Sequence, residues 1–287
     1  MEGDEHGARP HLLGVNPRAA ADTRVVPFND LATLERVLAS GNVAAVITEP
    51  ALTNAGVVLP ADGFHAGMRE LARAHEALLV LDETHTQTVA YGGLTRAWGL
   101  EPDVIALGKS TGGGIPIGAY GMTDDLRDWM ERHRDVYVGA PGLATGGTTY
   151  ANPLSLAATV ATLREIQTPE AFERVAALGV QLADGIEAAA ARVGLPWRAH
   201  RLGGRSGYCL EPELPRDARD AERSLDIELI DTRRLFMANR GVWDAIAGAG
   251  PAASFAHTAA DVDEYLWVLE AFLGDVVGET GGYGNGR

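Results

Sequence analysis

The first half of the chain alternates between two hydrophobic patterns. Residues 30–40 and 64–77 carry apolar positions at helical spacing, and Asn29 or Asp30 could cap the first of these helices. Three short segments are apolar throughout: residues 43–47, 78–81 and 104–107. Because these predicted strands lack polar alternation, both of their faces should be buried. The pattern predicts an α/β fold with a mostly parallel sheet and helices on both faces.

Longer helical patterns dominate the second half. Residues 153–166 and 169–193 are amphipathic and rich in Ala, Leu and Glu, and residues 260–276 form a predicted closing helix. Strand-like pieces occur in residues 200–210 and 241–257. A smaller C-terminal α+β domain is therefore expected to follow the large domain.

These patterns divide the chain into two domains and a tail. We assign residues 1–167 to the large α/β domain and residues 168–276 to the small C-terminal domain. The Gly-rich residues 277–287 predict a disordered tail. A chain of 287 residues is long enough for two such cores.

Charge and cysteine content narrow the choice of partners. The chain has 39 Asp and Glu against 24 Lys and Arg, so it should repel nucleic acid and anionic membrane surfaces. Cys209 is the only cysteine, which excludes an internal disulfide framework and a cysteine-rich metal site. The sequence shows neither a signal-peptide pattern nor an apolar run of about 18 residues. We expect a cytoplasmic protein that binds neither nucleic acid nor a membrane.

Each of the three predicted strands delivers one charged residue near its carboxyl end: Glu49, Asp82 and Lys109. In an open parallel sheet these ends line one crevice, where ligands bind. Buried charges also need partners. All three residues are therefore candidate ligands of one bound molecule.

The segment VIALGKSTGGGIPIGAYG carries the sharpest chemical signal. Lys109 leaves a buried strand and is followed by Gly112, Gly113 and Gly114. A low dielectric keeps a lysine amine neutral and nucleophilic, and glycines let the backbone approach a flat ring, as a Schiff base with an aldehyde cofactor requires. The alternatives are a surface lysine and a phosphate loop, although Asp103 stands where the first glycine of such a loop must be.

Two further segments contain candidate ligands. In LLVLDETHTQTVAYGG, Asp82 could keep a pyridine nitrogen protonated, or it could cap a following turn. His85 and Thr86 follow where they could touch the edge of the ring, and a packed structural role is equally expected for His85. In GGTTYANPLSLAA, the turn and its hydroxyls suit a phosphate, although ordinary helix capping fits these residues better.

The chain resembles class III aminotransferases of fold type I. The resemblance is carried, in order along the chain, by ITEPALTNAGVVLP, the three segments above and the C-terminal SFAHT. It is strongest to the branch of glutamate-1-semialdehyde aminomutase and its aminotransferase relatives. The resemblance implies the cofactor pyridoxal 5'-phosphate (PLP). It also makes residues 1–167 the C-terminal part of the PLP-binding large domain.

The resemblance implies roles for five residues. Lys109 forms the Schiff base with PLP and shuttles protons, while Asp82 pairs with the pyridine nitrogen. Thr84 lies against the ring face, and His85 reaches the phenolic oxygen. Thr148 matches the threonine that binds the phosphate of the neighbouring subunit's cofactor.

The chain departs from the family in two ways. Family members carry about 120–150 further N-terminal residues, with a phosphate loop and an aromatic residue stacked on the ring, roughly a domain-sized piece. We therefore expect a homo-oligomer whose cofactor cup is completed by a separate N-terminal chain or by a longer product. Aminomutases also carry a glutamate before the SFAHT-like segment where this chain has Ala249 or a neighbouring small residue, which argues against the aminomutase reaction.

The predicted function is PLP-dependent transfer of an amino group between an amino acid or amine and a keto acid or aldehyde. The alternatives are an aminomutase or racemase that uses the same lysine, and a catalytically inactive subunit of a split aminotransferase. Four arginines could include a clamp for a substrate carboxylate, although solvated surface charge is expected for each: Arg205, Arg233, Arg234 and Arg240.

Overall fold

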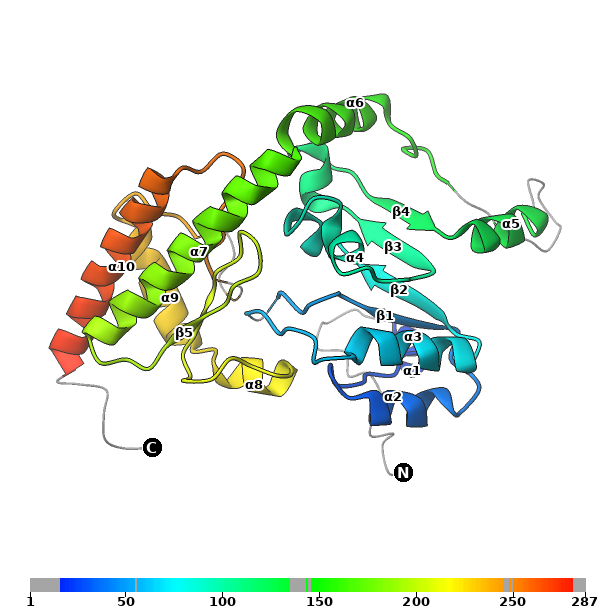
Figure 1. Ribbon diagram of the computed structural model, residues 1–287, viewed down its shortest axis with the longest axis horizontal. Coiled ribbons are helices and arrows are strands. Elements are labelled where there is room, and N and C mark those ends of the chain that lie inside the picture. Colours follow the sequence, from blue (N-terminus) through cyan, green and yellow to red (C-terminus); the bar gives the residue numbers. More distant parts are fainter. Residues whose placement is uncertain are drawn as a thin grey trace.

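Two lobes lie side by side in the computed structural model (Figure 1). The blue to green N-terminal lobe contains the larger sheet, and the C-terminal lobe, green to red, is mostly helical. The long helix α7 (Pro169–Arg192) leads from the first lobe into the second. The structure describes residues 16–54, 56–134, 143, 146–244, 248 and 250–280.

A four-stranded sheet forms the centre of the N-terminal lobe. Its strands pair in chain order: β1 (Ala45–Thr48), β2 (Leu78–Asp82), β3 (Val104–Leu107) and β4 (Ala119–Met122). The first three strands are parallel, and β4 is antiparallel to β3. The α/β prediction is confirmed in this coarser form, as a mixed sheet. Strand β4 was not predicted.

Two helices cover one face of this sheet. Helices α2 (Leu31–Leu38) and α3 (Phe64–Ala74) pack together with the apolar side chains that alternate strand residues present on that face. The Asp30 carboxylate caps α2 by accepting a hydrogen bond from the Thr33 N–H at 2.9 Å, as predicted. The shared core includes Leu34, Leu38, Phe64, Met68, Leu79 and Leu81.

The prediction of helices on both faces of the sheet is wrong for the described residues, because the opposite face is exposed. Ile47 and Tyr120 lie on it with 70% and 50% of their surface exposed, and the strand register places Asp82 on the same face. The helices that the structure describes leave both apolar side chains uncovered. The short apolar strands predicted burial of both sheet faces, but the described residues of this chain bury only one of them.

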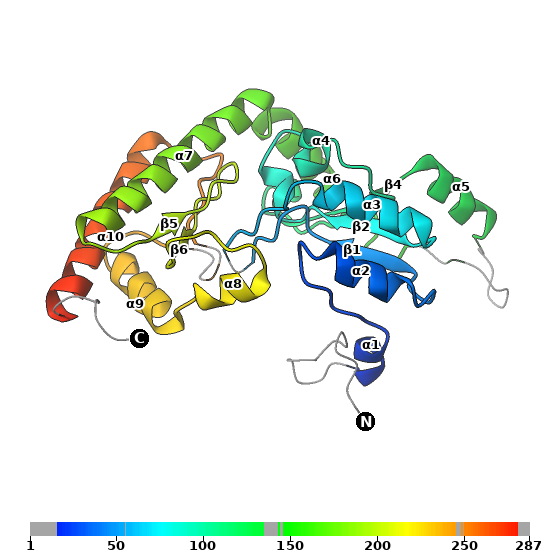
Figure 2. The ribbon, with the colours of Figure 1, turned by 60° about the horizontal axis from the view of Figure 1, so that its bottom comes forward.

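Shorter elements complete the N-terminal lobe (Figure 2). The helical segment predicted at residues 153–166 is an α-helix that continues as one turn of π-helix. The elements are α1 (Pro17–Ala21), 3-10 turns η1 (Thr86–Thr88) and η2 (Lys109–Gly112), α4 (Gly93–Ala97), α5 (Asp124–Arg132), α6 (Pro153–Ala161) and π-helix η3 (Thr162–Ile166).

The C-terminal lobe is built on α7 and α10 (Ala259–Thr280), which lie side by side in Figures 1 and 2. Between them come β5 (Arg198–Ala199), antiparallel to β6 (Tyr208–Cys209), and the helices α8 (Ala218–Arg223) and α9 (Ile227–Ala238). Buried side chains of α7, α9 and α10 form one core. The predicted domain boundary at residue 168 stays a prediction.

Two boundaries in this lobe differ from those predicted. Helix α10 continues to Thr280, so residues 277–280 of the predicted tail are helical, and residues 281–287 lie outside the described residues. In residues 241–257 the structure shows no regular strand among the described residues, only an isolated bridge from Ala252 to Arg205. None of the described helices is long and apolar enough to span a membrane.

Candidate active site

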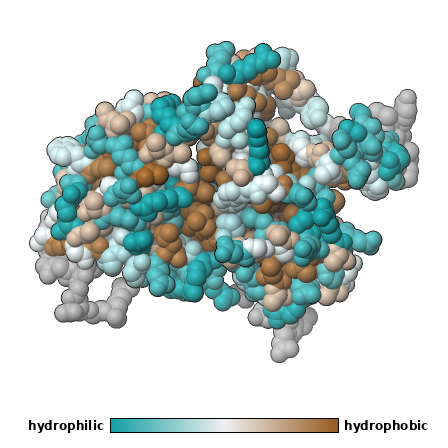
Figure 3. All heavy atoms as spheres, in the orientation of Figure 1, coloured by the Kyte–Doolittle hydropathy of each residue, from teal (hydrophilic) through white to brown (hydrophobic). Residues whose placement is uncertain are grey.

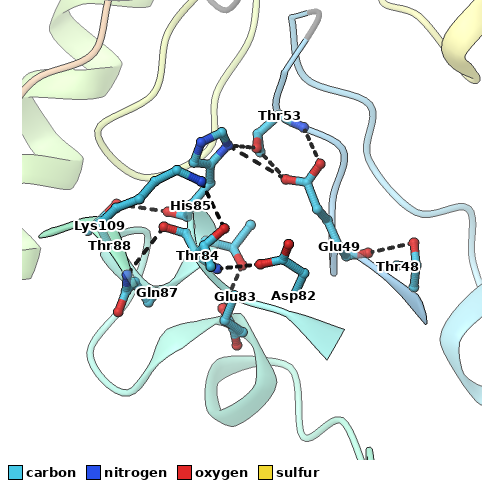
Figure 4. A network of polar contacts seen from close by, with 11 residues as sticks. Thr48, Glu49, Thr53, Asp82, Glu83, Thr84, His85, Gln87, Thr88 and Lys109 are labelled. Atoms are coloured by element: carbon cyan, nitrogen blue, oxygen red, sulfur yellow. Dashed lines mark hydrogen bonds and ion pairs between the residues drawn. The ribbon is translucent and has the colours of Figure 1, made fainter. Parts of the chain in front are cut away.

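The carboxyl ends of β1, β2 and β3 meet in one polar network (Figure 4). Lys109 Nζ donates a hydrogen bond to Thr84 Oγ1 at 2.9 Å, and the Thr84 N–H donates to Asp82 Oδ1 at 2.9 Å. His85 Nδ1 lies 3.8 Å from Glu49 Oε2. The structure thus brings together the three predicted strand-end residues with Thr84 and His85.

The backbone at Lys109 is held in an unusual conformation. Its φ of 50° is left-handed, which is uncommon for a residue with a side chain and persists where surrounding contacts impose it. Gln87 Nε2 donates to the Gly108 carbonyl, and Thr111 Oγ1, with one proton to donate, lies 2.8 Å from the same carbonyl and 2.5 Å from Gln87 Oε1. Gln87 and Thr111 are buried. They fix the start of the Lys109 turn, and sequence reasoning missed both.

Two of the three glycines after Lys109 are needed for close packing. A Cβ at Gly113 would collide with the Thr162 hydroxyl, and one at Gly112 would press on Ile117. Only Gly114 faces open space among the three. Room for a flat ring therefore does not explain all three glycines, since Gly112 and Gly113 are required by packing.

Asp82 caps the turn that follows it, as its alternative role predicted, and still has one oxygen to spare. One oxygen accepts the Thr84 N–H, and the other makes no hydrogen bond with a described residue. The neighbouring Glu83, 1% exposed, caps a different element: its carboxylate accepts the N–H groups of Leu94 and Thr95 at the start of α4. Alternate residues of a strand point to opposite sides, which explains why only Asp82 faces the network.

Glu49 and His85 share the hydroxyl of the buried Thr53. Thr53 Oγ1 lies 2.5 Å from Glu49 Oε2 and 2.7 Å from His85 Nδ1. A hydroxyl has one proton, so donation to Glu49 leaves its lone pair to accept from His85 Nδ1–H. Burial, aided by the charges of Arg205 and Lys109, lowers the pKa of His85 to about 4. The imidazole is therefore neutral at neutral pH, whereas burial raises the pKa of the Glu49 carboxyl.

Thr148 lies apart from this network. It is exposed in the turn before α6 and forms no side-chain hydrogen bond with a described residue. The helix is capped by Asn152, whose Oδ1 accepts the N–H groups of Leu154 and Ser155 at 3.0 and 3.2 Å. A phosphate role for Thr148 stays a prediction, and Ala249 lies outside the described residues.

Three of the four candidate arginines are not solvated surface charges. Arg233 is 1% exposed, forms an ion pair with the buried Asp244, and donates to Tyr265 at 3.2 Å, so it serves the C-terminal core. Arg205 is partly buried, and its Nε is fully buried with no hydrogen-bond partner. Arg234 is also partly buried, and its Nε is buried without a hydrogen-bond partner. The expected surface role is therefore wrong for all three, because tertiary packing covers this part of α9 and the loop that carries Arg205.

The network presents the functional groups that PLP needs on its lysine side. The Lys109 amine is exposed, so the low dielectric expected around it is not provided by the described residues, although a primary amine can still bond to an aldehyde. A carboxylate with one unbonded oxygen can hold a pyridinium proton. A neutral imidazole lies beside them. No cluster of metal-binding side chains occurs among the described residues.

Comparison with known proteins gives the class of this chain. Residues 5–204 match the family aminotransferase class III. The match covers well over half of the 287 residues. The chain belongs to the class III aminotransferases.

Within that family it is similar to glutamate-1-semialdehyde 2,1-aminomutases. Identity is 38% over 268 residues with the enzyme of Roseiflexus castenholzii and 36% over 273 residues with that of Chloroflexus aggregans. These matches cover 90% and 91% of this chain but only 58% and 60% of the relatives. The chain thus spans about three fifths of the length of these curated proteins.

Solved structures agree with this placement. The glutamate-1-semialdehyde aminomutase of Pseudomonas aeruginosa PAO1, solved with PMP, is 37% identical with a TM-score of 0.82, covering 92% of this chain and 59% of its own. An omega-transaminase from Sphaerobacter thermophilus is 28% identical with a TM-score of 0.82, covering 94% and 61%. Another relative, 25% identical, is a transaminase with PLP bound. The fold is that of fold type I aminotransferases.

Proposed function

We propose that this chain carries the lysine side of a PLP-dependent active site that transfers an amino group between an amino acid or amine and a keto acid or aldehyde. One observation carries the proposal: the Lys109 amine and the Asp82 carboxylate end adjacent parallel strands and are joined through Thr84. Lys109 is also the only lysine of the chain. A lone lysine in this position is the nucleophile that the family's chemistry requires.

Each residue has a defined task in this proposal. Lys109 Nζ would hold the aldehyde of PLP as a Schiff base and move a proton at the α-carbon of the substrate. Asp82 would hold a proton at the pyridine nitrogen, and PLP, when bound, supplies an electron sink for the carbanion at that α-carbon. Thr84 would contact the ring face, His85 the phenolic oxygen, and Glu49 would orient His85 through Thr53.

Isomerisation on the same cofactor is the alternative hypothesis to amino transfer. The similarity to aminomutases favours an isomerase as the second candidate. Against it stands Ala249, or a neighbouring small residue, where the aminomutases carry a glutamate. A racemase would use the same lysine, whereas an inactive subunit of a split enzyme would not use Lys109 for catalysis.

The sheet gives a physical reason to expect further chain around this site. Strands β1 and β4 are its two edges, and no strand among the described residues pairs with the outer side of either one. Ile47 and Tyr120 are exposed on the face that carries Asp82. We propose that residues beyond this chain, in a longer product or a separate N-terminal chain, pair with these edges and complete the cofactor cup.

The projecting segment formed by α6 and η3 supports assembly into a homo-oligomer. It stands out from the N-terminal lobe and carries brown, apolar residues on its surface (Figures 1 and 3). Exposed apolar patches of this kind mark interfaces, and a two-fold axis is the commonest closed arrangement. The exposed apolar residues are Leu154, Leu156, Val160, Leu163 and Ile166, together with Tyr150 just before α6.

Light scattering should therefore give the mass of a dimer or a higher even-numbered assembly. Leu154→Asp combined with Leu163→Asp should shift the assembly towards monomer, because two charges would be buried without partners at the interface. Val180→Asp, on an exposed position of α7, is the matched control and should leave the mass unchanged. A wild-type monomer that binds PLP and turns over unaided would refute this assembly.

Chemical trapping tests the proposed function directly. The protein is mixed with PLP and reduced with borohydride, first alone and then together with any product encoded directly upstream. We expect one phosphopyridoxyl group per chain, and peptide mapping should place it on Lys109, since the chain offers no other lysine. The labelled form should be inactive, and the unreduced form should release a keto acid or aldehyde from an amino donor. Absence of label in both preparations would contradict the proposal.

A further inference from the structure

We propose that the Thr84 hydroxyl is a proton relay for Lys109: it takes protons from the lysine amine and passes them to the oxygen of the aldehyde with which that amine condenses. The inference rests on the proposed function, because PLP is the aldehyde of that site. The reacting atom that Thr84 contacts is Lys109 Nζ, at 2.9 Å from its Oγ1 (Figure 4). Among the described residues, Thr84 is the one hydrogen-bond partner of this amine.

Packing directs the two arms of the Thr84 side chain. The branched Cβ of a threonine restricts rotation about χ1, so its methyl and hydroxyl groups turn together. The methyl group lies beside Gly108, where a Cβ would be 3.5 Å from Thr84 Cγ2, an ordinary contact. With the methyl group against Gly108, the hydroxyl lies towards the end of the Lys109 side chain. The orientation of the hydroxyl towards the amine therefore follows from the packing of the neighbouring strand ends.

One buried side chain ties together the backbone segments that carry the hydroxyl and the amine. Gln87 Nε2 donates to the Thr84 carbonyl at 3.2 Å and to the carbonyl of Gly108, the residue before Lys109. An amide nitrogen carries two protons, so both hydrogen bonds can form at the same time. The Thr84 N–H is in turn bonded to Asp82 Oδ1. The backbone therefore holds Thr84 Oγ1 and Lys109 Nζ at hydrogen-bond distance.

The direction of this hydrogen bond leaves the amine reactive. Lys109 Nζ donates, and Thr84 Oγ1 accepts. The lone pair of a neutral amine then stays free to attack a carbonyl carbon, whereas a hydroxyl that donated to the nitrogen would occupy that lone pair. The Thr84 hydroxyl keeps its own proton and donates it to none of the described residues. Thr84 thus receives from nitrogen at one lone pair and has one proton to give.

Condensation of an amine with an aldehyde moves two protons from nitrogen to oxygen, which is the task of such a group. The nitrogen first attacks the carbonyl carbon, a C–N bond forms, and one proton passes from nitrogen to oxygen. The second proton then follows, the C–O bond breaks, water leaves and the C=N double bond forms. In each transfer Thr84 accepts an N–H proton while its own proton goes to the oxygen, so the hydroxyl is regenerated.

The test measures how fast Lys109 condenses with PLP, independently of amino transfer. The protein, purified together with any chain it requires, is mixed with saturating PLP, and portions are reduced with borohydride at intervals. Peptide mapping then gives the fraction of Lys109 labelled. Thr84→Val keeps the branched shape and the backbone bond to Asp82 but has no hydroxyl. Its first-order rate should fall about tenfold, less than an acid–base group can contribute, because water reaches the exposed amine. A relay speeds both directions equally, so the final labelled fraction should not change.

Two variants separate a relay from a loss of structure. Thr84→Ser keeps a hydroxyl on the same carbon and should retain most of the wild-type rate. Thr95→Val is the matched control, because Thr95 Oγ1 is buried without a hydrogen-bond partner, and its rate should equal that of the wild type. In deuterium oxide the wild-type step should slow more than the Thr84→Val step, since the hydroxyl proton moves during the transfer.

The outcomes for the relay and for the proposed function can be distinguished. Equal labelling rates in wild type and Thr84→Val would overturn the relay, while label at Lys109 would still support the PLP site. A Thr84→Ser rate as low as that of Thr84→Val would also overturn it. Absence of label with PLP in the wild type would refute the proposed function, and the same series with acetaldehyde then decides the relay. Slower labelling of Lys109 in Thr84→Val by acetaldehyde would support it, and equal rates would overturn it.

Discussion

Replacing Lys109 by alanine is expected to abolish both PLP trapping and amino transfer. The chain has no other lysine, so no side-chain amine remains to bond to the aldehyde or to move the α-proton. Loss of a nucleophile without a substitute should lower the rate by several orders of magnitude. Borohydride trapping followed by mass spectrometry of the intact chain measures the first effect, and release of keto product measures the second.

The fold of this variant should be unchanged. The Lys109 side chain is exposed, and its one hydrogen bond goes to Thr84, so the free energy of unfolding should change by less than about 1 kcal/mol. Lys109→Arg keeps the charge without a nucleophilic amine and should be equally inactive. Phosphopyridoxyl label within the chain of either variant, away from its N-terminal amine, would refute the assignment.

Changing Asp82 to asparagine should leave PLP bound at Lys109 but slow removal of the α-proton by orders of magnitude. Asparagine keeps the oxygen that accepts the Thr84 N–H, so the local backbone is preserved. What disappears is the negative charge that keeps the pyridine nitrogen protonated, and with it most of the electron-withdrawing power of the ring. Exchange of the α-proton of an amino acid for solvent deuterium measures this step alone.

An analogue of PLP with a methyl group on the pyridine nitrogen provides the control. Its permanent positive charge needs no carboxylate, so it should restore part of the exchange rate in Asp82→Asn. It should give no comparable gain in the wild-type protein, where Asp82 already maintains the charge. Unchanged exchange in Asp82→Asn with normal PLP would mean that another group holds the pyridine nitrogen.

Local sequence patterns were enough to predict the framework of this site. Short apolar segments located β1, β2 and β3, because runs without polar alternation are typical of the strands of a parallel sheet. Asp82 and Lys109 were found because a charged residue directly after such a segment lies at the carboxyl end of a strand. The same reasoning missed β4, since Ala119–Met122 holds two small residues in four and lacks a continuous apolar run.

The sequence by itself determined which residues end the strands, and therefore which chemistry the site holds: one amine, carboxylates and an imidazole. Only the tertiary structure decided which of them face one another. It turned Asp82 towards the network and Glu83 into the cap of α4, and it set Gln87 and Thr111 beneath the Lys109 turn. It also brought Arg205 from a distant loop to the crevice and left Ile47 uncovered. Hydrophobic periodicity reports local burial, whereas contacts between segments far apart in the chain depend on how whole elements pack.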